Sequence, residues 1–127
     1  MTNKPRLLAL SAAAIALAAM APLAIAQSDP GGTLFQQKCK ACHVVTPGGA
    51  PGPIAPNLRG VVGRKAASTA FKSYSPALKA SNLTWTKASL DKFLTAPGKM
   101  VPGTRMVIAV TDANQRKQII DWLGTQK

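Results

Sequence analysis

Two stretches in the second half of the chain place apolar side chains three and four residues apart. The positions are Leu90, Phe93 and Leu94 in the first stretch, and Ile119, Trp122 and Leu123 in the second. Residues at this spacing share one face of an α-helix, so each stretch predicts a helix that packs on a core. In the second stretch Arg116 and Lys117 fall outside the apolar face, and we expect both in solvent.

Polar residues and prolines beside these stretches predict where the two helices begin and end. Either Thr84 or Thr86 can cap the first helix with its hydroxyl, and Pro97-Gly98 stops it. Thr111-Asp112 begins the terminal helix in the same way. Both helices are therefore short, with defined ends.

Two further helices are predicted earlier in the chain. Gly31–Thr33 opens a helix that includes Phe35, after a lead-in over Gln27–Pro30. Ser75-Pro76 combines a capping serine with a proline at the first helical position, and the helix that it begins ends near Asn82. The sequence thus predicts an all-α domain of three or four short helices joined by long loops.

The loops are long for so small a domain. Thr46–Pro56 contains four prolines and three glycines, which forbid a regular helix or a central strand, and 60–73 is irregular as well. Loops of this length are uncommon in a compact domain unless they wrap around something. We therefore expect the chain to enclose a bound group.

The sequence Cys39-Lys40-Ala41-Cys42-His43 identifies that group. A C-x-x-C-H run is the attachment signature of a c-type haem. On a helical turn, Cys39, Cys42 and His43 share one face, so two thiols can bond the haem vinyl groups while the imidazole reaches the iron. Covalent attachment suits a carrier better than an enzyme that exchanges its cofactor.

Three other interpretations of the two cysteines are weaker. A structural zinc site needs four ligands, and this chain offers two Cys, one His and four scattered acids. A redox-active C-x-x-C is typical of a βαβ unit, which the pattern does not predict. A structural disulfide between Cys39 and Cys42 would close a loop too small to add much stability.

The first residues predict export. Lys4 and Arg6 precede an apolar stretch, Leu7–Ala26, which ends in the small-x-small pattern Ala24-Ile25-Ala26 before Gln27. We expect residues 1–26 to be a cleaved signal peptide and 27–127 to be one domain located in the periplasm. An uncleaved membrane anchor is the alternative, because the apolar stretch is long for a signal peptide.

Net charge limits the class of partner. The chain has 16 basic residues and four acids. Residues 1–26 contain two of the basic residues and no acid, so the rest of the chain carries a formal charge of +10. Such a surface suits acidic partners or anionic surfaces. Nucleic acid is not expected, since no recognition helix or basic run interleaved with aromatic residues is present.

A six-coordinate haem iron needs a second axial ligand besides His43. The chain has no other histidine, and both thiols are used, so methionine remains. Outside residues 1–26 the candidates are Met100 and Met106. The turn Pro102–Arg105 favours Met106, because it can present a side chain inward without helical constraint.

The motifs taken together resemble those of class I cytochromes c, over the whole chain after residue 26. The shared features are Phe35 four residues before Cys39, Ala55–Gly60 after the haem loop, Gly63-Arg64-Lys65, Thr84-Trp85, and the ligand loop Pro102–Met106. This resemblance implies the cytochrome c fold wrapped around one covalent haem c.

The resemblance also implies roles for single residues. Met106 would be the distal iron ligand, and the Pro56 carbonyl would bind the free N–H of His43. Other implied contacts are Arg64, Tyr74 and Trp85 around a buried haem propionate, Thr104 at the haem beside Met106, and Gly31 and Phe35 packed on Ile119 and Trp122.

Three positions depart from the family pattern. Leu78 stands where many members have an asparagine near the haem, and Phe93 where many have a tyrosine whose hydroxyl reaches the ligand sulfur. Ile108 replaces an aromatic residue that follows the ligand by two positions. We expect a thinner buried polar network and a haem edge that is covered differently.

These features predict a monohaem electron carrier rather than an enzyme, one that acts as a monomer between respiratory or dehydrogenase partners. Lys38, Lys99 and Arg105 match basic positions that the family presents around the haem edge, where acidic docking surfaces of an oxidase, reductase or dehydrogenase would bind. The alternative is a haem enzyme or gas sensor with a displaceable distal ligand.

Overall fold

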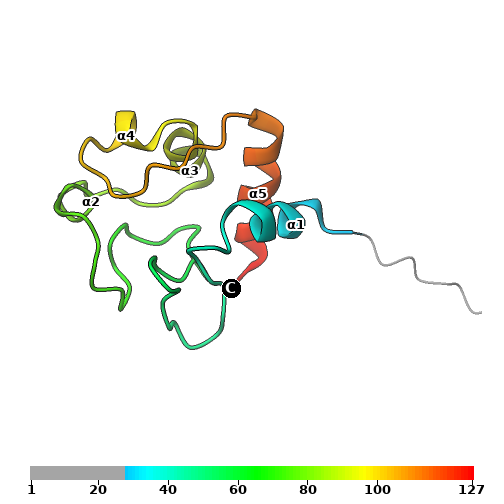
Figure 1. The fold of residues 1–127 in the computed structure, drawn as a ribbon, viewed down its shortest axis with the longest axis horizontal. Coiled ribbons are helices and arrows are strands. Elements are labelled where there is room, and N and C mark those ends of the chain that lie inside the picture. The colour runs from blue at the N-terminus through cyan, green and yellow to red at the C-terminus, as the bar shows by residue number, and fades with distance from the viewer. Residues whose placement is uncertain (1–27) are drawn as a thin grey trace, which may run out of the picture.

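The computed structural model describes residues 28–127, which form five helices (Figure 1). In chain order they are α1 (Pro30–Lys38), α2 (Pro76–Ala80), α3 (Lys87–Thr95), α4 (Pro97–Met100) and α5 (Ala113–Thr125). The described part holds no strand, only one isolated bridge between Lys65 and Thr84. The all-α prediction is confirmed, with one helix more than expected. The predicted signal peptide lies outside the described residues.

The ends of α1 and α2 differ slightly from the prediction. Asp29 caps α1 by accepting hydrogen bonds from the N–H groups of Gly31 and Gly32, so the helix begins at Pro30 rather than within Gly31–Thr33. Ser75 caps α2 as predicted, with its hydroxyl accepting from the Leu78 N–H at 3.1 Å. That helix ends at Ala80, before Asn82.

The helix α3 ends before Pro97-Gly98 as predicted, but a further helix begins at Pro97 that the sequence did not indicate. Thr86, not Thr84, caps α3, in a reciprocal pair of hydrogen bonds with Ser89. After Thr95 the chain turns once and resumes as α4, with Pro97 at its first position. Proline has no N–H to continue the hydrogen bonds of α3, so that helix ends before Pro97. The first turn of a helix does not use its N–H groups for such bonds, so Pro97 can begin α4.

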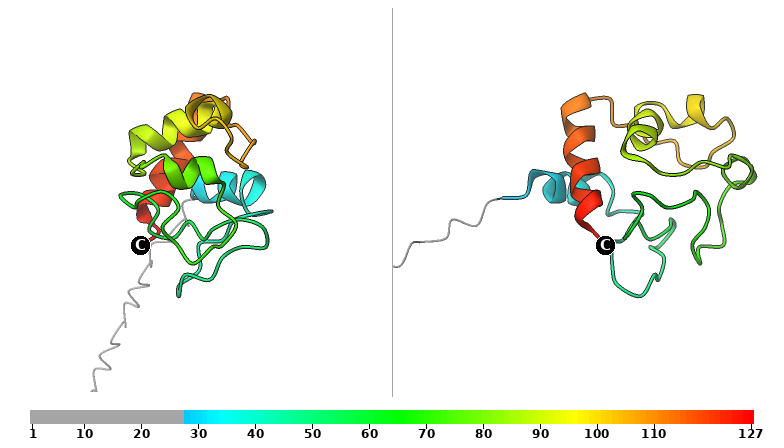
Figure 2. Two further views of the ribbon diagram at one scale, coloured as in Figure 1. Left: turned by 90° about the vertical axis from the view of Figure 1, so that its left-hand side faces the viewer. Right: turned by 180° about the vertical axis from the view of Figure 1, so that it is seen from behind.

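The core forms where α1 crosses α5 and where α3 packs on α5 (Figure 2). Phe35 and Ile119 are each 1% exposed at the first crossing. Trp122 also lies there, with its ring centroid 4.9 Å from that of Phe35. This is the contact that the resemblance implied for the terminal helices.

Arg116 does not lie in solvent as the helical pattern predicted. It is 8% exposed, and its guanidinium binds Asp91 of α3 at 2.8 Å. The pattern assigns polar residues to the outer face of a helix, but a long arginine can turn inward where acceptors are available. Lys117, the neighbouring residue, is exposed as expected.

Long irregular segments connect the helices. Residues 39–75 pass from α1 to α2 without a helix, and they lie to one side of the α1–α5 pair in Figure 1. Among residues 28–127, no helix has both the length and the apolar character to cross a membrane.

Candidate haem-binding site

The C-x-x-C-H motif lies at the point where α1 ends. The Cys39 N–H still bonds the Phe35 carbonyl, and the N–H groups of Cys42 and His43 both donate to the Cys39 carbonyl, at 3.1 and 2.9 Å. The helical turn therefore continues through the motif and keeps its i, i+3, i+4 spacing. Both cysteines are free thiols and partly buried.

The environment of Cys39 does not suit a redox-active dithiol. Burial raises the pKa of this thiol to about 11, with Lys38 opposing and Cys42 adding to the shift. Redox-active C-x-x-C pairs instead lower the pKa of their attacking thiol to keep it ionised. The Cys39 thiol is thus protonated near neutral pH, unlike the attacking thiol of a redox-active pair.

His43 is held for metal binding through its opposite ring nitrogen. Its Nδ1 lies 2.8 Å from the Pro56 carbonyl oxygen, the contact that the resemblance implied. Because a carbonyl oxygen only accepts hydrogen bonds, Nδ1 carries the proton, and Nε2 keeps a lone pair. Burial lowers the pKa of His43, against the opposing effect of the Pro56 contact, which favours the neutral imidazole that a metal requires.

Asn57 fixes the loop that brings Pro56 to His43. It is 2% exposed, and its amide nitrogen donates to the carbonyls of Thr46 and Ala50 at 2.9 and 2.8 Å. Its side-chain oxygen accepts from the Arg59 N–H at 2.8 Å. Sequence reasoning quoted this residue within a motif but gave it no role; a lone asparagine in a loop rich in proline and glycine was the available signal.

The same loop packs tightly on the haem motif. Gly52 lies so close to the Cys42 carbonyl that a side chain at this position would overlap it. Its N–H bonds the Ala55 carbonyl at 2.8 Å, which closes the turn. The proline- and glycine-rich segment is therefore ordered against the motif.

Met106 lies in the segment between α4 and α5. It is half-buried and packs against the core. Its N–H donates to the Thr104 hydroxyl at 3.3 Å, and Arg105 bonds the Ser73 carbonyl at 2.7 Å, so the loop is tied to residues before α2. Thr104 thus shapes the turn that carries the predicted ligand.

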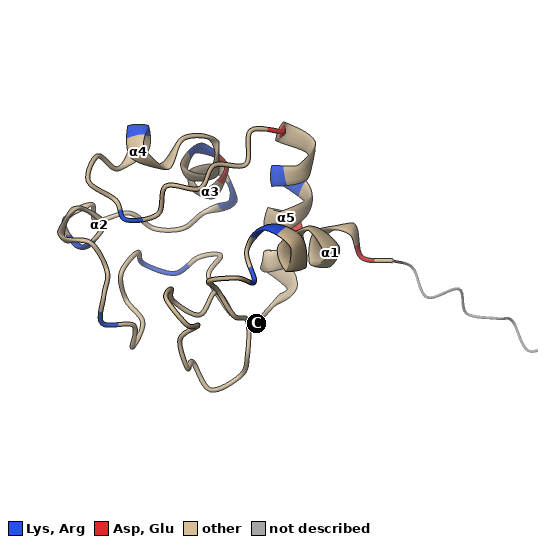
Figure 3. Cartoon of the chain, viewed as in Figure 1, with Lys and Arg blue, Asp and Glu red and all other residues tan. Residues whose placement is uncertain are grey.

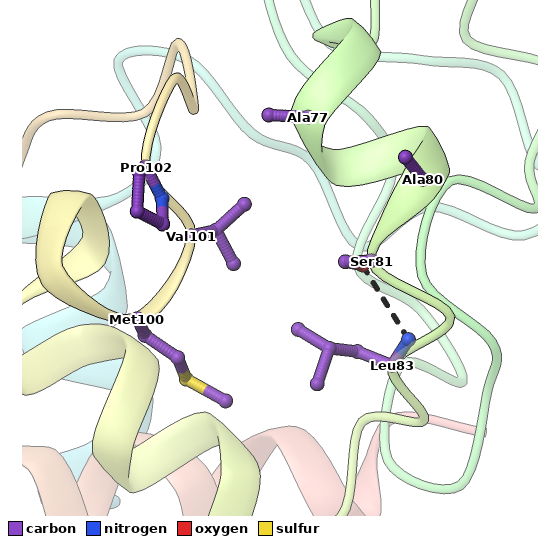
Figure 4. A pocket seen from close by; sticks show the side chains of 7 residues that line it. All are labelled: Ala77, Ala80, Ser81, Leu83, Met100, Val101 and Pro102. Carbon is purple, nitrogen blue, oxygen red and sulfur yellow. Dashed lines mark hydrogen bonds between the residues drawn. The ribbon is translucent and has the colours of Figure 1, made fainter.

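Met100, the other candidate ligand, occupies a different environment. It belongs to α4 and lines a surface pocket of about 330 Å³ between α2 and α4 (Figure 4). The remaining lining residues are Ala77, Ala80, Ser81, Leu83, Val101 and Pro102. None of these residues belongs to the C-x-x-C-H motif.

Arg64, Tyr74 and Trp85 gather in one region. The Arg64 guanidinium donates to the Asn57 and Arg59 carbonyls, and burial lowers its pKa while Tyr74 opposes that effect. The Trp85 N–H bonds the Arg64 carbonyl at 2.8 Å. Tyr74 is buried and exchanges a hydrogen bond with the Thr69 hydroxyl. Arg64 and Tyr74 therefore form side-chain hydrogen bonds in this region, and Trp85 is joined to Arg64 through the backbone.

The three departures from the family pattern have structural counterparts. Phe93 is 5% exposed and packs on Trp85 with ring centroids 4.9 Å apart. Leu78 is half-buried against the core. Ile108 is 59% exposed, and Val107 beside it is 78% exposed. The segment after Met106 therefore presents apolar side chains to solvent.

The residues present fit a c-type haem. Two free thiols, an imidazole with a free Nε2 and a half-buried thioether are the groups that attach and ligate this cofactor. No carboxylate belongs to the set, which agrees with a cofactor whose iron prefers nitrogen and sulfur donors.

Comparisons with known proteins agree. The cytochrome c family model matches residues 28–127. A cytochrome c2 of Rhodomicrobium vannielii is 44% identical over 106 residues, covering 81% of this chain and 83% of that protein. Cytochrome c-554 of Methylosinus trichosporium is 42% identical over 97 residues, covering 76% and 73%. The structure of cytochrome cH from Methylobacterium extorquens matches with a TM-score of 0.68 and 40% identity, covering 76% of this chain and 95% of that one.

A family model that spans every described residue, joined to relatives above 40% identity, establishes what the motif predicted. The chain belongs to the cytochrome c family, as a class I member that carries one covalent haem c and transfers electrons rather than catalysing a reaction.

Proposed function

We propose that this protein is a periplasmic electron carrier in which His43 and Met106 are the axial ligands and Cys39 and Cys42 are the attachment points. The observation that carries this assignment is the hydrogen bond from His43 Nδ1 to the Pro56 carbonyl, which leaves Nε2 available. It shuttles single electrons between respiratory or dehydrogenase partners.

His43 and Met106 would hold the haem iron from its two sides. The bound haem supplies an iron that accepts and releases one electron. Pro56 holds the His43 ring in one orientation and one tautomer. Met106 offers a neutral thioether, a ligand that raises the reduction potential relative to stronger donors. With both of these side chains bound to the iron, small ligands such as O₂ would have no free site.

Arg64, Tyr74 and Trp85 are proposed to surround a buried haem propionate. Their support is their common location and the backbone bond between Arg64 and Trp85. Burial lowers the pKa of the Arg64 guanidinium, and a propionate carboxylate beside it would offset that effect. Thr104 supports the loop beside Met106.

The proposed docking surface comprises Lys38, Lys99 and Arg105. All three are exposed, and they come from the end of α1, from α4 and from the Met106 loop. The exposed apolar residues Val107 and Ile108 follow directly after Arg105 and Met106. Basic residues around a small apolar patch suit transient contact with acidic redox proteins. We propose that the protein is a monomer between such encounters.

Spectroscopy of two methionine variants tests the ligand assignment. Met106→Ala should give a high-spin haem that binds CO, while Met100→Ala should retain the ferric absorption band of iron–thioether bonding. CO binding by the unsubstituted reduced protein would instead support a gas sensor with a displaceable ligand. Retention of the band in Met106→Ala, with its loss in Met100→Ala, would overturn the assignment.

Location is tested separately. Export should yield a periplasmic protein that begins at Gln27, read by mass spectrometry of the purified protein. A membrane-bound product that retains residues 1–26 would show that the apolar stretch is an anchor.

A further inference from the structure

The segment that carries Met106 has a buried anchor on its C-terminal side. Arg116 of α5 donates through Nη1 to the carbonyls of Val110 and Thr111, at 2.9 and 2.8 Å. Its Nε donates to Asp91 Oδ1 of α3 at 2.8 Å. One guanidinium therefore connects the end of the Met106 segment with two helices.

Val110, which Arg116 binds, is the first buried residue after Met106. Val107, Ile108 and Ala109 are exposed. Val110 is 5% exposed, and its N–H bonds the Leu94 carbonyl at 2.8 Å. The path of the chain just after Met106 thus depends on where Val110 and Thr111 are held.

Burial of the Arg116 guanidinium costs free energy unless its N–H groups find hydrogen-bond acceptors. Its side chain is 10% exposed, whereas its partner Asp91 is 50% exposed. A paired, buried charge that contributes little net stability still fixes geometry, because an arginine fork binds several acceptors in one arrangement. A lysine has a single ammonium and cannot reproduce that fork.

We infer that Arg116 is a positioning residue for Met106: by holding the Val110 and Thr111 carbonyls it keeps the thioether at the haem iron. This inference rests on the proposed role of Met106 as ligand. A brace between α3 and α5 is the competing role, and it would act through Asp91 alone. The two roles differ in which bonds of Arg116 matter.

Imidazole competition distinguishes them. Ferric holoprotein is titrated with imidazole at neutral pH, and loss of the iron–thioether band reports displacement of Met106. Arg116→Lys should bind imidazole about tenfold more tightly, which corresponds to losing one hydrogen bond of a charged group. Asp91→Asn keeps an oxygen acceptor for Nε and leaves both carbonyl bonds, so it should bind imidazole as the unsubstituted protein does.

The free energy of unfolding, measured for both variants, separates local from global effects. Both should be less stable, but only Arg116→Lys should change imidazole affinity in the absence of denaturant. Equal imidazole affinity in Arg116→Lys and the unsubstituted protein would overturn the inference, as would an equal shift in Asp91→Asn. Met106→Ala is measured in parallel. If the iron–thioether band survives in this variant, the ligand assignment is refuted. If the band is lost there but Arg116→Lys binds imidazole as the unsubstituted protein does, only the role of Arg116 is refuted.

Hydrogen exchange on the unsubstituted protein tests the anchor if Arg116→Lys does not fold. Cyanide, which binds haem iron, is added to the ferric protein to displace Met106. The Val110 amide should remain slow to exchange, while the Thr104 amide, which bonds Val101 within the loop, should exchange faster. Loss of protection at Val110 together with Thr104 would show that no fixed anchor exists there.

Discussion

Gly31 of α1 lies directly against Trp122 of α5: a Cβ on Gly31 would be 2.5 Å from the Trp122 Cβ. It would also overlap the Gln118 carbonyl of the same helix. The two helices therefore approach at a point where only a hydrogen atom fits. This contact sets how deeply Phe35 reaches the core and where the haem motif after α1 begins.

Gly31→Ala should force the two helices apart and lower the free energy of unfolding by about 1–3 kcal/mol, the usual cost of overpacking. The matched control is Gly98→Ala in α4, where a Cβ meets no atom within 4 Å. That change should be neutral or slightly stabilising, because alanine favours a helix more than glycine does. Chemical denaturation followed by circular dichroism gives both values. Equal costs at the two positions would contradict the close approach.

Asn57→Ala should weaken the loop that positions His43. Asn57 is 2% exposed, and its side-chain amide is hydrogen-bonded through both its nitrogen and its oxygen. The substitution removes this amide, so the Arg59 N–H and the carbonyls of Thr46 and Ala50 lose their partner. The expected loss of unfolding free energy is about 2–3 kcal/mol. Exchange of the His43 Nδ1 proton, followed by NMR, should become faster. The exposed Asn114 provides a control, and Asn114→Ala should change neither value.

Asp121 predicts a pH dependence of stability. Hydrogen bonds from Lys117 and Lys87 lower its pKa from 3.8 to about 2. Because the folded pKa is the lower one, the stabilisation is complete above the ordinary value and is lost as pH falls through the folded value. The stability difference between the unsubstituted protein and Asp121→Asn should therefore be constant above about pH 5 and shrink towards about pH 2.

Denaturation with urea across this pH range measures that difference. The carboxylate is exposed, so the difference should be small and decrease with added salt. A difference that persists unchanged at the lowest pH would show that Asp121 stabilises the protein by packing rather than by charge.

Salt should slow the reaction with anionic oxidants. The Debye length shrinks from about 30 Å at 0.01 M to about 8 Å at 0.15 M, which screens the attraction of a strongly basic surface. Stopped-flow oxidation of the reduced protein by ferricyanide should therefore slow as ionic strength rises. Lys99→Glu should reduce the rate more than Lys127→Glu, although both change the net charge equally. Equal effects would place the electron-transfer surface away from Lys99.

The sequence predicted the features that depend on spacing or on single residue types. The C-x-x-C-H run, the capping residues Ser75 and Asp112, and the apolar face around Ile119 all appear as expected. Each is a local rule, in which neighbours along the chain determine the structure. The contact of His43 with Pro56 was implied only by the family resemblance, since 13 positions separate the two residues.

The errors arose where distant parts of the chain meet. Arg116 was expected in solvent, but acceptors from α3 and from the Met106 segment make burial favourable. Asn57 received no role, because its partners come from the far side of a loop whose shape the sequence does not reveal. A polarity pattern describes one helix or strand at a time, whereas the environment of these residues is formed by several segments of the chain.

The four acids of the chain have a consequence beyond its net charge. Asp29, Asp91, Asp112 and Asp121 all lie in α1, α3 and α5 or cap them, whereas the charged residues of α2, α4 and residues 39–75 and 101–111 are all Lys or Arg (Figure 3). Such a separation of charge gives the molecule an electric dipole moment as well as a monopole. In the field of a negatively charged partner it experiences a torque, and it rotates its acid-free side forward before the two surfaces touch.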